Sequence, residues 1–163
     1  MLICKKIKME KAVNIPLIAD LKAENKNPEY LWWVGSAGAF DDRYKKVSRE
    51  FAKILTYLET DYAVLGTEEL SSGDIARRAG NEMLFQMQAL MNIEVLNLYG
   101  VKKIITSDPH VFNCFKNEYP DYDGNYEVIH HSQFLLERIE KGKIKFDKNN
   151  MLAGKPATDH DPC

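Results

Sequence analysis

Short apolar runs alternate along the chain with longer segments in which apolar residues recur every three or four positions. Four runs rich in aromatic and β-branched residues favour buried strands, at 30–34, 62–65, 103–106 and 126–130. Helical periodicity follows the runs, in segments at 41–58, 82–98, 108–119 and 134–139. Alternating strands and helices imply right-handed crossovers and a mainly parallel sheet. The sequence therefore predicts an α/β fold with helices on both faces and Rossmann-like layering.

Capping residues mark where several of these helices begin and end. An aspartate at 41 precedes the first helical segment, and Asp108 with Pro109 predicts an N-cap followed by the first residue of a helix. Gly100 and Gly142 are placed to end two others. Between the first strand and the first helix, Gly35-Ser-Ala-Gly38 predicts a tight loop. The neighbouring aromatic residues Trp32, Trp33 and Phe40 are predicted to lie in the core.

Composition adds limits to this fold. A chain of 163 residues with 45% hydrophobic residues fits one globular domain, and 24 acidic against 22 basic residues give a net charge of -2 that demands no nucleic acid or anionic membrane as partner. The longest apolar stretch, Tyr30–Val34, is far below the ~20 residues of a membrane-spanning helix. The start of the sequence shows no signal peptide, so we expect no direct insertion into a membrane.

The cysteines at 4, 114 and 163 have no paired spacing. Scattered cysteines fit a reducing compartment better than a disulfide framework, which predicts a cytoplasmic location. Cys114 falls on a predicted helix, where a partly buried structural thiol is expected.

The loops that leave the carboxyl ends of parallel strands gather at one edge of a sheet, where ligands bind. In this chain those loops lie at 35–40, 68–78, 107–111 and 130–133. They carry three motifs, W-V-G-S-A-G-A-F-D-D-R at 33–43, S-S-G-D-I-A-R-R-A-G-N-E at 71–82 and S-D-P-H-V-F-N at 107–113.

These motifs resemble the cysteine-rich, CCG-type domain of heterodisulfide reductases and related iron-sulfur oxidoreductases. The family's pattern is G-C-x-G, then C-C-G or C-T-G-D, then C-P-H-C. The resemblance covers about residues 28–163 and implies one CCG-type domain, with a lead-in at 1–29, an α/β core at 30–142 and a tail at 143–163. His160-Asp-Pro-Cys163 is similar to the start of the family's second cysteine motif. By this resemblance the chain is the first domain of a heterodisulfide-reductase-like electron-transfer protein.

The resemblance also assigns the residues of the cluster loops. The positions that correspond to family cysteines hold Ser36, Ser71, Ser72, Asp108 and Val111. The other cluster-loop residues carried over from the family are Gly35, Gly38, Gly73, Asp74, Arg77, Arg78, Pro109 and His110. Because a four-iron cluster is held by thiolates, we expect no cofactor in this chain, although the family binds [4Fe-4S], and we assign no catalytic residue. Serine and aspartate at such positions are predicted to satisfy backbone N–H groups of loops and helix starts.

Two other functions remain open from the sequence. One is a cluster-free structural or protein-interaction module; the other is a small-anion site that uses Arg77 and Arg78. Those arginines are otherwise expected to pair with aspartates at 41, 42 or 74. His130 and His131 resemble a family histidine pair that can tune redox or proton behaviour, or serve as structural residues.

The family further implies a second CCG domain, or a flavoprotein or iron-sulfur redox partner, and possible association with a membrane through a parent complex. A homodimer is predicted if an apolar patch remains exposed on the surface of this domain.

Overall fold

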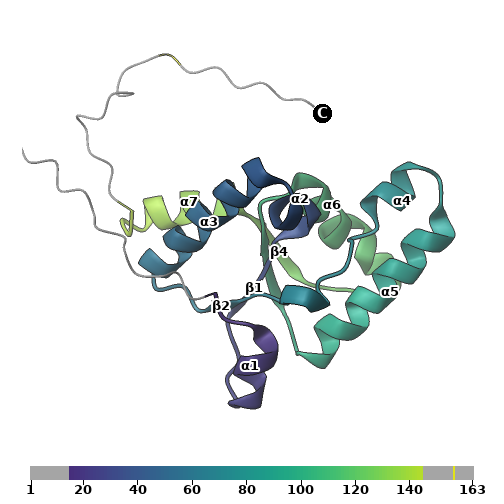
Figure 1. Cartoon of the computed structure of the whole chain (residues 1–163), viewed down its shortest axis with the longest axis horizontal. Helices are drawn as coiled ribbons and strands as arrows, with labels where there is room; N and C mark the ends of the chain where they lie inside the picture. The colour runs from purple at the N-terminus through teal and green to yellow at the C-terminus, as the bar shows by residue number, and fades with distance from the viewer. Residues whose placement is uncertain (1–14, 145–155, 157–163) are drawn as a thin grey trace, which may run out of the picture.

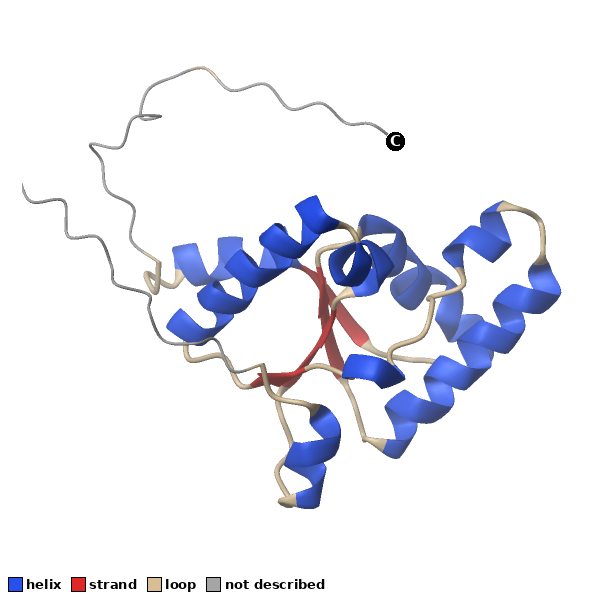
Figure 2. Ribbon diagram, in the orientation of Figure 1, coloured by secondary structure: helices blue, strands red, loops and turns tan. Residues whose placement is uncertain are grey.

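A four-stranded parallel sheet lies at the centre of the chain. The computed structural model describes residues 15–144 and residue 156. The strands are β1 (Tyr30–Trp33), β2 (Tyr62–Ala63), β3 (Lys103–Thr106) and β4 (Glu127–His130). They are arranged in the order β2-β1-β3-β4, and every neighbouring pair is parallel (Figure 2). The predicted α/β class is confirmed.

The register of the sheet aligns the ends of three strands. Trp33 of β1 pairs with Thr106 of β3, and Thr106 pairs in turn with His130 of β4. The loops that follow these three residues therefore start side by side at the carboxyl edge of the sheet. This alignment brings together motifs that are far apart in the sequence.

Helices cover both faces of the sheet (Figure 1). The helices are α1 (Ile18–Ala23), α2 (Gly35–Phe40), α3 (Asp42–Tyr57), α4 (Asp74–Arg78), α5 (Glu82–Leu98), α6 (Pro109–Asn113) and α7 (His131–Glu140). Short 3₁₀ turns occupy Gly66–Glu68 and Tyr119–Tyr122, and a π-helical turn spans Cys114–Glu118. The helix predicted at 108–119 therefore changes its winding at Cys114, whereas the helix predicted at 82–98 has the bounds expected.

The core consists of two clusters, one on each face of the sheet. Successive strand residues point to opposite faces, so Trp33 of β1 packs with Phe85 of α5 and Phe115 of the π turn. Trp32 packs on the other face with Phe51 of α3. Trp32 and Trp33 are 2% and 1% exposed, which confirms their prediction as core residues.

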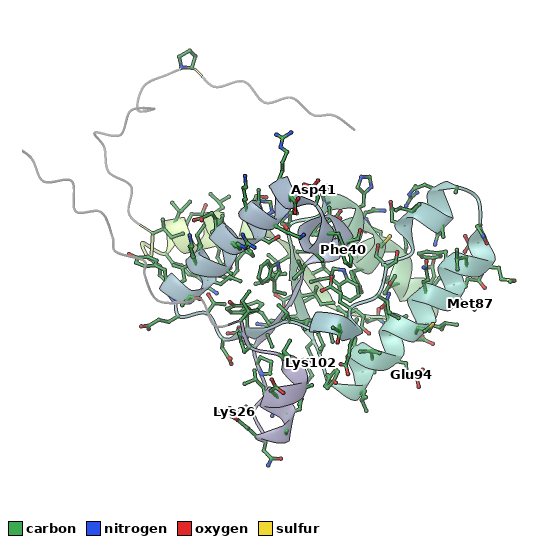
Figure 3. All side chains as sticks on the ribbon, viewed as in Figure 1. Lys26, Phe40, Asp41, Met87, Glu94 and Lys102 are labelled. Atoms are coloured by element: carbon green, nitrogen blue, oxygen red, sulfur yellow. The ribbon has the colours of Figure 1, made fainter. Side chains whose placement is uncertain are left out.

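Two features of the loop after β1 were predicted wrongly. Gly35-Ser-Ala-Gly38 is the first part of helix α2 and not a tight loop. Gly35 turns the chain into α2 with φ +79°. Gly38 allows α2 to lie close to α3, because a Cβ on Gly38 would lie 2.9 Å from Ser48 Oγ. Phe40 is 80% exposed at the end of α2 instead of buried (Figure 3), since the chain leaves the helix there to begin α3.

Helix α1 was not predicted, and it lies in the segment treated as a lead-in. Ile18 of this helix is buried in the core. Its backbone N–H donates to the carbonyl of Val64 at 2.9 Å, and the N–H of Val64 donates to the carbonyl of Pro16 at 2.9 Å. This pairing attaches residues 16–18 beside β2, so the ordered fold includes part of the predicted lead-in.

One surface helix exposes a stripe of large apolar side chains. The outward face of α5 presents Met83, Met87, Leu90, Met91 and Leu98, each at least half exposed. Figure 3 shows Met87 and Glu94 pointing away from the sheet. An exposed apolar patch was the condition for the predicted homodimer, which stays a prediction.

Within residues 15–144, no helix is long and apolar enough to cross a membrane. The His160–Cys163 motif and Cys4 lie outside the described residues.

Candidate functional site

A cavity of about 590 Å³ lies at the carboxyl edge of the sheet. Its walls come from the start of α2, the loop into α4, and the loop into α6. Nine of the residues predicted for the site line it, namely Gly35, Ser36, Ser71, Ser72, Asp74, Arg78, Asp108, His110 and Val111. The other four predicted residues, Gly38, Gly73, Arg77 and Pro109, are not part of its lining. Trp33, Leu70, Ile75 and Ala79 complete the wall.

The first wall is fixed by a carboxylate that no sequence motif had indicated. Glu69 Oε2 accepts the N–H of Val34 at 3.0 Å, and Glu69 Oε1 accepts the N–H of Gly35 at 2.6 Å. Burial raises the pKa of Glu69 to about 7, although the two N–H donors oppose that rise. The only signal in the sequence was the position of Glu69 at the start of a loop assigned to the ligand-binding edge.

The second wall is held by hydrogen bonds to its backbone and by its own serine. Ser71 Oγ accepts the N–H of Gly73 at 3.2 Å, which confirms the prediction that serine satisfies a loop N–H at this position. Asn92 of α5 donates to the carbonyl of Ser71 at 2.8 Å. The hydroxyl of Tyr119 donates to the carbonyl of Ser72 at 3.0 Å. The loop is thereby fixed to α5 and to the turn after the π segment.

The third wall begins at a capped helix start, as predicted. Asp108 Oδ1 accepts the N–H groups of His110 at 2.8 Å and Val111 at 3.3 Å, and Pro109 occupies the first turn. Tyr44 of α3 donates its hydroxyl proton to the carbonyl of Ser107 at 3.0 Å. The carboxylate at position 108 therefore has a structural task in capping α6, and α3 is attached to the same loop.

A charge network of two largely buried carboxylates and two arginines forms part of the cavity wall. The Arg78 guanidinium contacts Asp74 Oδ1 at 3.1 Å and also pairs with Glu118 Oε1. Arg77 Nε lies 3.6 Å from Glu118 Oε2. The predicted pairing with Asp74 is confirmed for Arg78, and Glu118 is the additional partner of both arginines. The other two candidates act elsewhere: Asp41 caps α3 and the neighbouring aspartate pairs with a lysine of that helix.

The network leaves the guanidinium charges balanced by carboxylates. His110 adds an imidazole whose Nδ1 lies 3.3 Å from Asp74 Oδ2. Asp74 is thus shared by an arginine and a histidine at the cavity wall. A cationic site that would attract a small anion needs guanidinium charge in excess, and the pairing with Asp74 and Glu118 removes that excess.

Cys114 lies behind the same network and not in the cavity. The thiol is fully buried, with Sγ 3.6 Å from Asp74 Oδ1 and 3.5 Å from Glu118 Oε2. Burial and the two carboxylates raise the pKa of Cys114 far above its usual range. The side chain therefore remains a neutral S–H donor. It is more deeply buried than predicted.

His130 and His131 pack edge to face at the end of β4, with ring centroids 4.3 Å apart. His130 Nδ1 lies 2.7 Å from Ser132 Oγ, and the His130 N–H donates to the side-chain carbonyl of Gln133 at 3.2 Å. Burial and the neighbouring imidazole lower the pKa of His131. Neither ring lines the cavity, and the buried His130 Nε2 and His131 Nδ1 have no hydrogen-bond partner in the described part of the chain, so the role of this pair stays a prediction.

The donor set of the cavity does not fit a four-iron cluster. Hydroxyls, two carboxylates, one imidazole and one guanidinium line it, and none of its lining residues carries a thiol. In the described part of the chain, no three His, Cys, Asp or Glu side chains converge as a metal site would require.

Comparisons with known proteins associate the chain with iron-sulfur oxidoreductases. It is 47% identical over 131 residues to a protein of Bacillus subtilis (strain 168) named "Probable iron-sulfur-binding oxidoreductase FadF", covering 80% of this chain and 19% of that protein. It is 44% identical over 143 residues to the EtfAB:quinone oxidoreductase of Syntrophomonas wolfei, covering 88% of this chain and 20% of that protein.

A third relative is one of the polypeptides of the dihydromethanophenazine:CoB--CoM heterodisulfide reductase of Methanosarcina barkeri. It is 31% identical over 152 residues, covering 88% of this chain and 35% of that polypeptide. The chain therefore spans about a fifth to a third of the length of these relatives. No family model and no solved structure matches it.

Proposed function

The chain belongs to the family of iron-sulfur oxidoreductases that carry the CCG-type domain, and from this premise we propose that it is an electron-transfer domain whose own cavity holds no cluster. The iron-sulfur and oxidoreductase assignment comes from the relatives. The statement about the cavity is the proposal. It concerns residues 15–144, where the three motif loops converge on one site.

The observation that carries the proposal is the chemistry at the predicted ligand positions. Ser36, Ser71, Asp108 and Val111 line the cavity together, so the geometry of a shared site is retained while the thiols are absent. Four thiolates normally hold a four-iron cluster, and the cluster would supply one-electron redox chemistry when bound. Serine and aspartate oxygens suit harder ions, and valine offers no donor.

The local contacts support the same conclusion, because two of the replacements, Ser71 and Asp108, are hydrogen-bonded within the fold. Asp108 caps α6 and Ser71 caps the turn at Gly73. Cys114 is the only cysteine within residues 15–144, and its thiol is engaged by two carboxylates behind the wall. The residues that remain in the loops therefore stabilise the loops themselves.

The test compares the unsubstituted chain with the variant S36C/S71C/D108C/V111C after anaerobic reconstitution with iron and sulfide. We expect the broad visible absorption of a four-iron cluster only in the four-cysteine variant. The single variant C114A serves as a control and should match the unsubstituted chain. An equally intense cluster spectrum in the unsubstituted chain, lost in a variant S36A/S71A/D108A, would show that oxygen ligands suffice and would overturn the proposal.

The finer assignments of location and partners are part of this proposal. We place the domain in the cytoplasm, in a complex with a flavoprotein or with another iron-sulfur domain. The support is the family, because FadF and the EtfAB:quinone oxidoreductase are named as oxidoreductases and the third relative as part of a multi-subunit reductase.

A further inference from the structure

Helix α3 carries a concentration of positive charge that contrasts with the rest of the chain. Its sixteen residues, DRYKKVSREFAKILTY, include five lysines and arginines and only two acidic residues. The whole chain has a net charge of -2. The other long helix, α5, contains no lysine or arginine at all. Helix α3 therefore carries a local excess of positive charge.

Three of the cations on this helix, Arg43, Lys46 and Arg49, make no ion pair within residues 15–144, and all three are exposed. The other two α3 cations are paired to carboxylates of their own helix. Helix pairs of that kind hold side chains against the helix, whereas unpaired cations keep their full charge available to a partner. We call the unpaired set, Arg43, Lys46 and Arg49, the cationic face.

The cationic face is hollowed and contains apolar surface. One shallow depression is lined by Arg43, Lys46, Tyr44 and Val47 together with Asp41, and a second one is lined by Lys46 and Arg49 together with Glu50. Val47, at the edge of this set, is 51% exposed, and Phe40 is exposed at the end of the preceding helix (Figure 3). An interface needs exposed apolar atoms for affinity and charges for steering, and both are present here.

The same helix is rigidly attached to the cavity. The hydroxyl of Tyr44 donates to the carbonyl of Ser107, next to the cavity residue Asp108. Ser48 donates to the carbonyl of Gly38 in α2, the helix that begins at the cavity wall. A protein bound on α3 would therefore rest on a helix that is hydrogen-bonded to two of the segments that form the cavity. Its position would be fixed relative to the three motif loops.

We propose that the cationic face of α3 is the docking surface for an acidic protein electron carrier. The proposal rests on the proposed electron-transfer function, which makes the partner a redox protein. Redox encounters use small interfaces steered by opposite charges, and a helix with three unpaired cations beside an exposed apolar residue meets that description. The carboxylates of the partner would take the pairing positions that are vacant on Arg43, Lys46 and Arg49.

The distribution of charge favours a protein over a membrane or a nucleic acid. Asp42 and Glu50 stand among the cations of α3, and a phosphate surface would repel them. A mixed face with a positive excess matches a protein surface that itself mixes charges with an acidic excess.

The test is a titration of the isotope-labelled protein with poly-L-glutamate of about twenty residues, followed by backbone NMR shifts at low salt. We expect shift changes confined to residues 40–53. The variant R43Q/K46Q/R49Q should bind about tenfold more weakly, because exposed ion pairs each add modestly and are additive across separate sites. The matched control K22Q/K102Q/K116Q removes the same charge from other elements, at lysines that also make no ion pair within residues 15–144. Lys102 lies away from α3 (Figure 3), and the control should change the affinity less than about twofold.

Three results would overturn the proposal. The first is the absence of binding to poly-L-glutamate at low salt. The second is an equal loss of affinity in the control variant. The third is cosedimentation with phosphatidylglycerol vesicles that R43Q/K46Q/R49Q abolishes, which would assign the face to a membrane. The iron content of the protein does not enter this titration. Failure of the docking proposal is therefore distinguishable from failure of the proposed function.

Discussion

The carboxyl of Glu69 should make the stability of this domain depend on pH around neutrality. Two effects act on this carboxyl in opposite directions. Two backbone N–H donors at 2.6 and 3.0 Å stabilise the carboxylate, whereas burial disfavours its charge. Burial is the larger effect, because the pKa rises from 4.5 to about 7. The folded state therefore binds the proton of Glu69 more tightly than the unfolded chain does.

The sign and the size of the effect follow from this rise in pKa. A raised pKa contributes stability that is fully present below the unfolded value, near 4.5, and is lost as the pH rises through the folded value, near 7. The rise corresponds to a loss of about 3 kcal/mol of unfolding free energy between pH 4 and pH 8 from this one group. The variant E69Q cannot lose a proton at this position, so it lacks that term.

Urea unfolding of the wild type and E69Q at pH 4 and pH 8 measures this term. At pH 4 we expect E69Q to be less stable by about 1 kcal/mol, because the glutamine NH₂ faces a backbone N–H instead of accepting it. At pH 8 we expect E69Q to be the more stable protein, by about 2 kcal/mol. The reasoning would be refuted if the difference did not move toward E69Q with rising pH, since the N–H bonds would then outweigh burial.

Three further predictions concern the walls and surface of the domain. Gly73 has φ +86°, and a Cβ there would lie 2.7 Å from Phe85 Cδ2, so G73A should lower the free energy of unfolding in urea by about 2 to 4 kcal/mol. The control G80A, at φ +79° with open space, should lower it by only about 1 kcal/mol. Equal losses in the two variants would contradict the packing argument. In the variant C4S/C163S, the thiol of Cys114 should resist alkylation at pH 8 until urea unfolds the chain, because burial raises its pKa; rapid labelling of the folded protein would contradict its burial. If the apolar stripe on α5 forms the predicted homodimer, M87E should lower the mass seen in sedimentation equilibrium, while Q86E, with the same added charge beside the stripe, should not.

The elements with strong local signals were predictable from the sequence. Helix α5 has an asparagine N-cap before it and a glycine after it, and its predicted and observed bounds agree. Asp108 and Pro109 mark the start of α6 in the same way. Helix α2 was mistaken for a loop because glycine pairs usually indicate turns. Here Gly35 turns the chain into a helix and Gly38 allows that helix to pack closely on α3.

The site could be located from sequence because the ends of parallel strands meet at one edge, and the motif loops do converge on one cavity. Its supporting contacts could not be found in the same way. Glu69, Glu118 and Asn92 act across distances of 21 to 40 residues along the chain, and no motif connects them to their partners. Phe40 was expected to be buried because aromatic residues usually are, yet its place between two helices leaves it exposed.

The central claim is that the cavity retains the site of an iron-sulfur domain without the ligands for a cluster. Its most direct test is the iron and acid-labile sulfide content of the unsubstituted chain, prepared and reconstituted without oxygen and then freed of unbound iron. We predict substoichiometric iron and sulfide in this chain, and about four of each per chain in S36C/S71C/D108C/V111C. About four iron and four sulfide per unsubstituted chain would contradict the account.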